Sequence, residues 1–452
     1  MYRREFLSTF GTGVAAAAAL AYAPKARAAT GPNIVLIVAD DLGYGELSIQ
    51  GAKDILTPNI DSIARNGVRF TQGYVTCPVC GPTRAGLLTG RYQQRFGFEF
   101  NSGPPGTESP QFGIPPAETI LPERLKSLGY ATGMFGKWHV GMQNGRTPTD
   151  RGFDEFFGFL GGSHSYTDAM SDSPNPILKG KDRVPSISYA TEDFAQEACA
   201  FIERHAQKHF FLYMPFNAVH SPMDVLPKHV EPFAGITDEK RRKFAGMLSA
   251  LDLAVGKIIS TLRAVEAYDN TLIIFLSDNG GPTQQITSSN GPLRGFKGQL
   301  LEGGIRVPFL MQWPGQISPD GTYTNPVSAL DLLPTILTAA AGESSPVPTL
   351  DGVNLLPYLS GKQAGRPHET LFWRYGDDWA VRSGDYKLVT TPENAVALYD
   401  LAKDVHEDND LSASSPDKVK EMRAAYETWN AKNIAPLWNR PERPTRRAAG
   451  NP

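Results

Sequence analysis

The stretch Ile34-Val35-Leu36-Ile37-Val38-Ala39-Asp40-Asp41 is apolar until it ends in two carboxylates. Three further apolar runs of strand length also end in polar residues: 131–135 before Gly136-Lys137-Trp138-His139, 210–216 before Asn217 and His220, and 272–276 before Ser277-Asp278-Asn279. Continuous apolar runs are typical of strands that are buried on both faces of a sheet. Helical patterns lie between the runs, over 60–66, 121–128, 194–205 and 239–267. The sequence therefore predicts a three-layer α/β sandwich with a largely parallel central sheet.

The polar ends of these strands predict a metal site. In parallel sheets, ligands bind beyond the carboxyl ends of the strands, so Asp40, Asp41, Asp278 and Asn279 are expected around one crevice. Three carboxylates would repel one another there without a cation, and oxygen ligands suit Ca²⁺ or Mg²⁺ rather than zinc. The alternative is that these are ordinary turn residues.

A second stretch, Cys80-Gly81-Pro82-Thr83-Arg84-Ala85-Gly86-Leu87-Leu88-Thr89-Gly90-Arg91, predicts a short helix that begins at Cys80. Pro82 suits a first turn and Gly90 an end. Free amides at the helix start favour an anion, and Arg84 lies about one turn further on, close enough to point at the same place. Alternatively, the C-x-x-C spacing of Cys77 and Cys80 indicates a thiol redox pair or half a zinc site.

Composition restricts the class of protein. The chain has 452 residues, 41% hydrophobic and 20% charged, which excludes a fibrous or disordered protein. Its formal net charge of -3 provides no overall positive potential that would attract nucleic acid. The three cysteines are too few for a disulfide framework, and Cys199 is predicted to be a core residue of a helix.

Residues 1–28 are predicted to be an export signal. Arg3-Arg4-Glu5-Phe6-Leu7 resembles a twin-arginine signal, and Ala26-Arg27-Ala28 has the form of a cleavage site. A Sec-type signal is the alternative. The apolar run 11–23 is too short to span a bilayer, so we expect a periplasmic or secreted protein without a stable membrane anchor.

The pattern C-x-P-x-R, followed by L-T-G-R, resembles the signature of the type I sulfatases, which belong to the alkaline phosphatase-like superfamily. The likeness, to arylsulfatases and N-acetylgalactosamine-6-sulfatases, extends from about residue 33 to about 409. It implies that a formylglycine-generating maturation enzyme oxidises Cys80 to formylglycine. It also implies that Asp40, Asp41, Asp278, Asn279 and residue 80 bind Ca²⁺, with Mg²⁺ as the alternative. Thr83 departs from the family, which usually has Ser or Ala at this position.

The resemblance also implies roles for the remaining polar residues. The hydrated formylglycine would attack sulfur after deprotonation by Asp278, with Arg84 beside it. Lys137 and Lys297 would bind the sulfate oxygens, His220 would protonate the leaving group, and His139 would help to expel sulfate. His164 and Arg374 are predicted to contact substrate, whereas His205, His209, His229, His368 and His406 are predicted to be surface residues.

The domain organisation is predicted as a catalytic domain at 29–345, a C-terminal subdomain at 346–440 and a disordered tail at 441–452. Short strand patterns at 370–373, 379–382, 386–389 and 397–399 predict a small antiparallel sheet, and 422–429 predicts a helix that packs on it.

The predicted function is hydrolysis of a sulfate monoester of a carbohydrate, such as a sulfated polysaccharide fragment, or of an aryl alcohol. Three alternatives stay open: a phosphate or phosphonate ester hydrolase of the same superfamily, a non-catalytic protein that binds sulfated glycans with Cys80 unmodified, and a thiol oxidoreductase that uses Cys77 and Cys80. The thiol oxidoreductase leaves Asp40, Asp278, Lys297 and His220 without a role.

Overall fold

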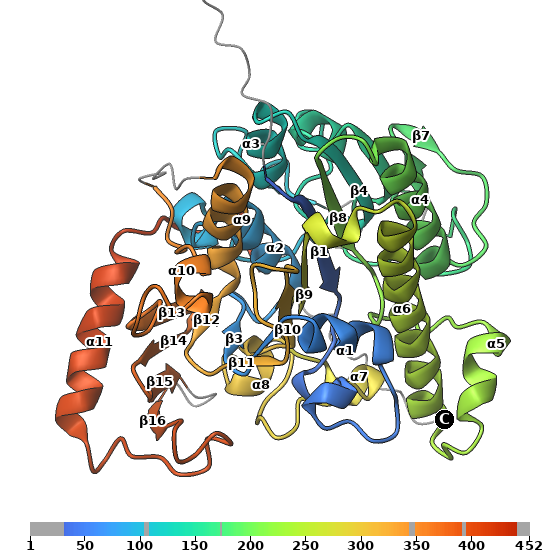
Figure 1. The fold of residues 1–452 in the computed structure, drawn as a ribbon. Coiled ribbons are helices and arrows are strands. Elements are labelled where there is room, and N and C mark those ends of the chain that lie inside the picture. Colours follow the sequence, from blue (N-terminus) through green and yellow to red (C-terminus); the bar gives the residue numbers. More distant parts are fainter. Residues whose placement is uncertain (1–30, 104–107, 172–173, 343–348, 391–394, 441–452) are drawn as a thin grey trace, which may run out of the picture.

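A central sheet with helices on both faces lies beside a smaller unit, drawn in orange and red in Figure 1. The computed structural model describes residues 31–103, 108–171, 174–342, 349–390 and 395–440. The predicted export signal, the predicted tail and the predicted domain boundary at 345 lie outside these described residues.

The central sheet has ten strands in the order β11-β2-β10-β9-β1-β8-β4-β5-β6-β7. Their bounds are β1 Asn33–Ala39, β2 Val68–Phe70, β4 Ala131–Lys137, β5 Glu155–Phe159, β6 Leu178–Lys179, β7 Asp182–Arg183, β8 Phe210–Pro215, β9 Thr271–Ser277, β10 Phe309–Gln312 and β11 Gly321–Tyr323. The middle strands, from β9 to β5, run parallel, while β10 is antiparallel to β9. The predicted, largely parallel sandwich is confirmed. A separate pair is formed by β3 Gly73–Tyr74 and β12 Val327–Ser328.

Strand β1 is buried on both faces, which explains its unbroken apolar run. Ile34, Leu36 and Val38 belong to one hydrophobic core, whereas Val35 and Ile37 belong to the other. The first core is covered by α2 Cys80–Thr89, α3 Leu121–Ser127 and α9 Leu332–Ala341; the second by α1 Pro58–Arg65, α4 Ala190–His205 and α6 Glu239–Ala264. Four shorter helices lie in connections: α5 Pro227–Val230, α7 Thr283–Ile286, α8 Glu302–Ile305 and α10 Leu356–Leu359.

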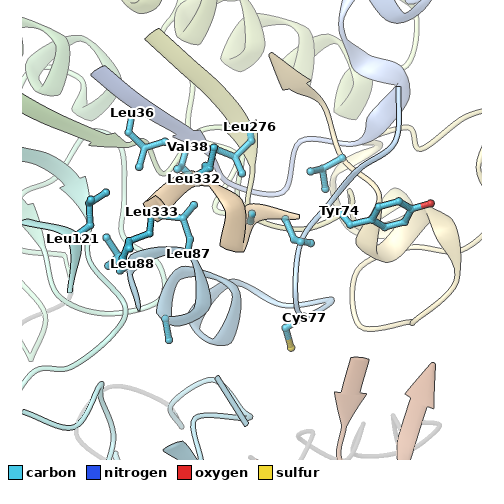
Figure 2. Close-up of a cluster of buried hydrophobic side chains, with 14 of the residues drawn as sticks. Leu36, Val38, Tyr74, Cys77, Leu87, Leu88, Leu121, Leu276, Leu332 and Leu333 are labelled. Atoms are coloured by element: carbon cyan, nitrogen blue, oxygen red, sulfur yellow. The ribbon is translucent and has the colours of Figure 1, made fainter. Parts of the chain in front are cut away.

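Helix α2 is fixed in place by its apolar side. Leu87 and Leu88 lie close to Leu332 and Leu333 of α9 in the first core, as Figure 2 shows. Gly90 ends the helix in the left-handed conformation at φ 64°, which a glycine adopts without a steric cost. Packing therefore determines where the first residue of this helix, Cys80, is presented.

Helix α6 has the length and apolar composition of a membrane-spanning helix. However, 67% of its most apolar window is buried inside the protein, where α6 packs on α4 and α1. Its apolar residues are those of a core helix.

The C-terminal unit contains the predicted antiparallel sheet, formed by β13 Thr370–Tyr375, β14 Asp378–Ser383, β15 Tyr386–Thr390 and β16 Val396–Asp400. Helix α11, Pro416–Asn430, covers one face and begins earlier than predicted, with Pro416 in its first turn. Trp379 and Tyr426 stack between sheet and helix with ring centroids 4.4 Å apart.

Two of the histidines predicted to be at the surface are instead largely buried. His229 Nε2 lies 2.8 Å from Glu192 Oε1, and His368 Nε2 lies 2.7 Å from Asp331 Oδ1. Each ring is satisfied by a carboxylate distant in sequence, which a local pattern cannot predict. Cys199 is buried as predicted.

Candidate active site

The polar residues that follow β1 and β9 meet at one edge of the central sheet. These strands pair in register, with Ala39 opposite Ser277. Asp40 and Asp278, the next residue of each chain segment, therefore lie at the same edge of the sheet. The backbone amide of Asp278 donates to the carbonyl oxygen of Ala39 at 3.0 Å. On the other side, Asp40 exchanges backbone hydrogen bonds with Ala218 and Val219, in the segment that leads from β8 to His220.

Three basic side chains pair with the carboxylates of Asp40, Asp41 and Asp278. Lys137 Nζ lies 2.5 Å from Asp40 Oδ2, and Lys297 Nζ lies 2.7 Å from Asp41 Oδ1. Arg84 donates to Asp278 Oδ2 from Nε at 2.9 Å and from Nη2 at 2.7 Å. The Lys137 and Arg84 pairs are fully buried, whereas 17% of the Lys297 side chain is exposed.

Cys80 lies within this group of charges at the start of α2. Its Sγ is 3.5 Å from Asp40 Oδ1, and its side chain is buried. Burial and the charge of Asp40 raise the pKa of the thiol to about 12, which keeps it neutral near pH 7. An unmodified Cys80 is therefore a poor nucleophile. The structure keeps Cys77 as a free thiol too, with no disulfide to Cys80.

The donor atoms fit a hard divalent cation. Ligand atoms of Asp40, Asp41, Cys80 and His220 all lie within 4.8 Å of one another. Asn279 Oδ1 is buried without a hydrogen-bond partner, while its Nδ2 donates to Asp41 Oδ1 at 2.7 Å. Carboxylate and amide oxygens are the ligands that Ca²⁺ and Mg²⁺ prefer. The family resemblance implied Asp40, Asp41, Asp278, Asn279 and residue 80 as ligands. The structure brings Asp40, Asp41 and Cys80 together with His220, which was predicted at this site as the group that protonates the leaving group.

The electrostatics of the carboxylates favour the same interpretation. Burial and the charge of Asp40 raise the pKa of Asp278 to about 6, despite its bond to Arg84. For Asp40, burial opposes ionisation, but Lys137 and other cations outweigh it and hold the pKa below its usual range. A cation at this place would stabilise the ionised form of Asp278.

Two histidines next to the carboxylates are largely neutral. Burial and the charge of Lys137 lower the pKa of His139, and its Nδ1 has no partner. Burial and the charge of Lys297 lower the pKa of His220. His220 Nδ1 lies 2.5 Å from the carbonyl oxygen of Ser221, which can only accept, so Nδ1 carries the proton. His220 Nε2, 3.6 Å from Asp41 Oδ2, is left to exchange a proton.

The two predicted substrate contacts differ in their surroundings. His164 is buried, with Nδ1 2.8 Å from the carbonyl oxygen of Ser165 and no partner for Nε2. Arg374 donates instead to Glu99, Asn430 and the carbonyl oxygen of Ile434. These bonds join β13 to a loop and to the C-terminal segment, so a substrate contact by Arg374 finds no support in this geometry.

Sequence reasoning missed one residue that supports the start of α2. Asn101 Oδ1 accepts a hydrogen bond from the amide of Gly81 at 2.9 Å. No local signal marks Asn101, because it lies in a polar loop beyond the helix. Thr83, the departure from the family pattern, is accommodated: its buried hydroxyl donates to the carbonyl oxygen of Cys77 at 2.9 Å.

Comparison of the sequence with known proteins identifies the family of this chain. A sequence model described as Sulfatase matches residues 32–343, and one described as N-sulphoglucosamine sulphohydrolase, C-terminal, matches 296–429. Human arylsulfatase A is 35% identical over 89% of this chain and 89% of its own length. Human N-acetylgalactosamine-6-sulfatase is 34% identical over 77% of this chain and 73% of its own length.

The structural comparison agrees. The crystal structure of Ps i-CgsB has a TM-score of 0.85 and 35% identity, and the match covers 91% of this chain and 95% of that one. Phosphonate monoester hydrolase of Agrobacterium radiobacter, at 22% identity and a TM-score of 0.62, shares the fold alone. The strand-end carboxylates, the Cys80 helix and these likenesses together show that the chain belongs to the sulfatase family and is a type I sulfatase of the alkaline phosphatase-like superfamily.

Proposed function

We propose that this sulfatase hydrolyses sulfate monoesters of carbohydrates, with formylglycine at position 80 and a bound Ca²⁺ ion. The observation that carries the proposal is the arrangement of Cys80 beside Asp40, among acidic oxygens and three basic side chains. When present, the formylglycine hydrate supplies the attacking hydroxyl, and the cation supplies positive charge for the sulfuryl oxygens. Mg²⁺ would fit the same oxygen donors.

The high pKa of the Cys80 thiol supports the need for modification. A neutral thiol attacks poorly, and burial together with the charge of Asp40 keeps this thiol neutral. The residues of this chain that would hold the cation are Asp40, Asp41, Asp278 and Asn279, with position 80 and His220 beside them.

The basic residues would bind and orient the sulfate group. Lys297 is partly exposed, so its Nζ can leave Asp41 for a ligand, while Lys137 stays buried against Asp40. Positive groups placed in a buried site stabilise the developing charge of the transition state more strongly than in water. Arg84 fixes the orientation of Asp278 through two hydrogen bonds.

The histidines would move protons at defined atoms. His220 Nε2 would hold the proton that the leaving alcohol oxygen receives. Its pKa is lowered in the protein alone, but the negative charge of a bound sulfate ester would raise it. His139 Nδ1, buried and unpartnered, would accept a proton from a hydroxyl at position 80.

A carbohydrate is the preferred substrate class. One relative is named N-acetylgalactosamine-6-sulfatase, and Ps i-CgsB has been crystallised with k-i-k-neocarrahexaose at 35% identity to this chain. His164 Nδ1 donates to the carbonyl oxygen of Ser165, so its buried, unpartnered Nε2 would accept a hydrogen bond from a sugar hydroxyl. Export through the twin-arginine machinery to the periplasm or beyond, guided by residues 1–28, would bring the enzyme to such substrates.

The proposal is tested with full-length enzyme matured by a formylglycine-generating enzyme and supplied with Ca²⁺. Release of sulfate from sulfated oligosaccharides is compared with release of phosphate from the phosphate ester of the same sugar. We expect a higher kcat/KM for the sulfate ester. A higher kcat/KM for the phosphate ester would favour phosphoester hydrolysis, and tight binding of the sulfated sugar without release would favour a binding protein.

A further inference from the structure

The loop that carries Lys297 is held at several points. It runs from residue 294 to 303 and is closed by a hydrogen bond from the Gly303 amide to the carbonyl oxygen of Arg294 at 2.7 Å. The amide of Gly298 donates to the carbonyl oxygen of Pro78 at 2.9 Å, two residues before Cys80. The position of Lys297 relative to Cys80 and Asp41 thus depends on this loop.

Both ends of the loop are bound by one residue of the C-terminal unit, Glu407. Its Oε2 accepts a hydrogen bond from the amide of Glu302 at 2.7 Å, and its carbonyl oxygen accepts one from Arg294 Nη1. Glu407 is fully buried and has φ 58°, a left-handed conformation that is uncommon for a residue with a side chain. Such a conformation persists only where surrounding contacts fix it.

Glu407 is fixed in turn by the antiparallel sheet. Lys387 of β15 is fully buried, and its Nζ lies 2.8 Å from Glu407 Oε1 and 2.9 Å from Glu302 Oε1. Tyr74 donates to Glu302 Oε2 at 2.6 Å from the segment that leads to Cys80. A continuous set of buried contacts therefore joins the C-terminal sheet to both the Lys297 loop and the Cys80 segment.

We propose that Glu407 is a positioning residue for catalysis, which acts from the C-terminal unit by holding the 294–303 loop so that Lys297 reaches the sulfate site. The inference rests on the role given to Lys297 in the proposed function. Misplacement of a group by about 1 Å can cost about 100-fold in rate, so a clamp at both ends of the loop has a kinetic consequence.

The experiment is a double-mutant cycle between E407Q and K297A in matured, Ca²⁺-loaded, full-length enzyme, with nitrophenyl sulfate as the probe. Gln keeps the size of the side chain but removes its charge and weakens the bond to the Glu302 amide. We expect E407Q to lower kcat about tenfold in the parent enzyme, as supporting residues of active sites do. In the K297A background we expect almost no further loss, because the positioned group is already gone.

Two further variants keep the test decisive. V381A opens a cavity in the core beneath α11 without a contact to the loop, so it should lower the melting temperature but leave kcat unchanged. If E407Q fails to fold, R294A takes its place, because it removes the other contact to Glu407 from an exposed side chain. R294A should lower kcat in the parent enzyme and cause almost no further loss in the K297A background.

Three results would overturn the proposal. They are an unchanged kcat in E407Q, a tenfold loss that persists in the K297A background, and an equal loss of kcat in V381A. An undiminished kcat in K297A alone would instead remove the role of Lys297 and with it the basis of the inference.

Discussion

Two clusters of buried charge are connected by the Lys297 loop, and they are built from similar residues. The site cluster consists of Asp40, Asp41 and Asp278 with Lys137, Lys297 and Arg84. The junction cluster consists of Glu302 and Glu407 with Lys387, Arg306, Arg382 and Tyr74. Both contain acidic groups held by Lys or Arg in the protein interior.

The clusters differ in access to solvent. Lys297 of the site cluster is 17% exposed, and the neighbouring His220 is 16% exposed. Two buried atoms beside this cluster, Asn279 Oδ1 and His139 Nδ1, have no hydrogen-bond partner. In the junction cluster, Lys387, Glu302 and Glu407 are fully buried. Paired buried charges alone therefore do not identify a catalytic site; partial exposure of the charged groups distinguishes the site cluster from the junction cluster.

The largest expected effect is on the chemistry of the site cluster. C80A should lower kcat at least about 10⁴-fold, since loss of a nucleophile removes the reaction path that the other residues support. The melting temperature should change little, because within the described part of the chain the thiol makes one weak hydrogen bond, at 3.5 Å. Steady-state kinetics and thermal unfolding of the same preparation check this, and substantial turnover by C80A would contradict the assignment.

The next effect concerns the stability of the junction cluster. K387M should lower the free energy of unfolding by about 3–5 kcal/mol, because it leaves Glu302 and Glu407 buried without their shared cation. Denaturant unfolding measures the change. The control is K403M, whose parent side chain is 83% exposed and pairs with Asp400, and which should change the free energy of unfolding far less. Equal losses in both variants would show that the junction pairs contribute no more than surface pairs.

A smaller effect is the response to metal, which is expected of the site cluster and not of the junction cluster. Ca²⁺ at about 100 times its dissociation constant should stabilise the protein by about 2.7 kcal/mol. D41N should reduce this stabilisation, since it removes a charge from the predicted ligands, whereas K403M should not. Thermal unfolding with Ca²⁺ and with a chelator checks both, and an unchanged melting temperature in the parent protein would argue against a cation among these residues.

The smallest effect is a pH dependence at the junction of the two units. Burial would lower the pKa of His368, but the charge of Asp331 and its hydrogen bond at 2.7 Å outweigh burial and raise it. Proton binding therefore favours the folded state, so this contribution is full below the ordinary pKa of about 6.5 and is lost as pH rises through the folded pKa. H368Q should remove up to about 1 kcal/mol of stability at pH 5.5 and less at pH 8.5. A larger loss at pH 8.5 would reverse the sign and refute this account.

Much of the fold could be predicted because its signals are local. The unbroken apolar runs of β1 and β9 follow from burial on both faces, and the polar residues directly after them meet because the strands pair in register. The start of α2 at Cys80 follows from Pro82 and Gly90.

The remainder depends on pairs that are distant in the chain. Glu302, Lys387 and Glu407 carry no local pattern, so the junction cluster appears only when the C-terminal sheet packs beside α8. The same holds for Asn101 at Gly81, for Arg374 at Glu99, and for His229 and His368 at their carboxylates. The residue type gives the chemistry of a side chain, but the role of that side chain depends on the residues that it contacts in the fold.

The most direct test of the central claim is a mass spectrum of the tryptic peptide Phe70–Arg84 from protein isolated from its native host. The account predicts that Cys80 has lost its sulfur and carries the aldehyde or its hydrate, while Cys77 stays a thiol. A peptide with two unmodified cysteines, or with a Cys77–Cys80 bridge in every molecule, would show that the proposed nucleophile is absent and would contradict the account.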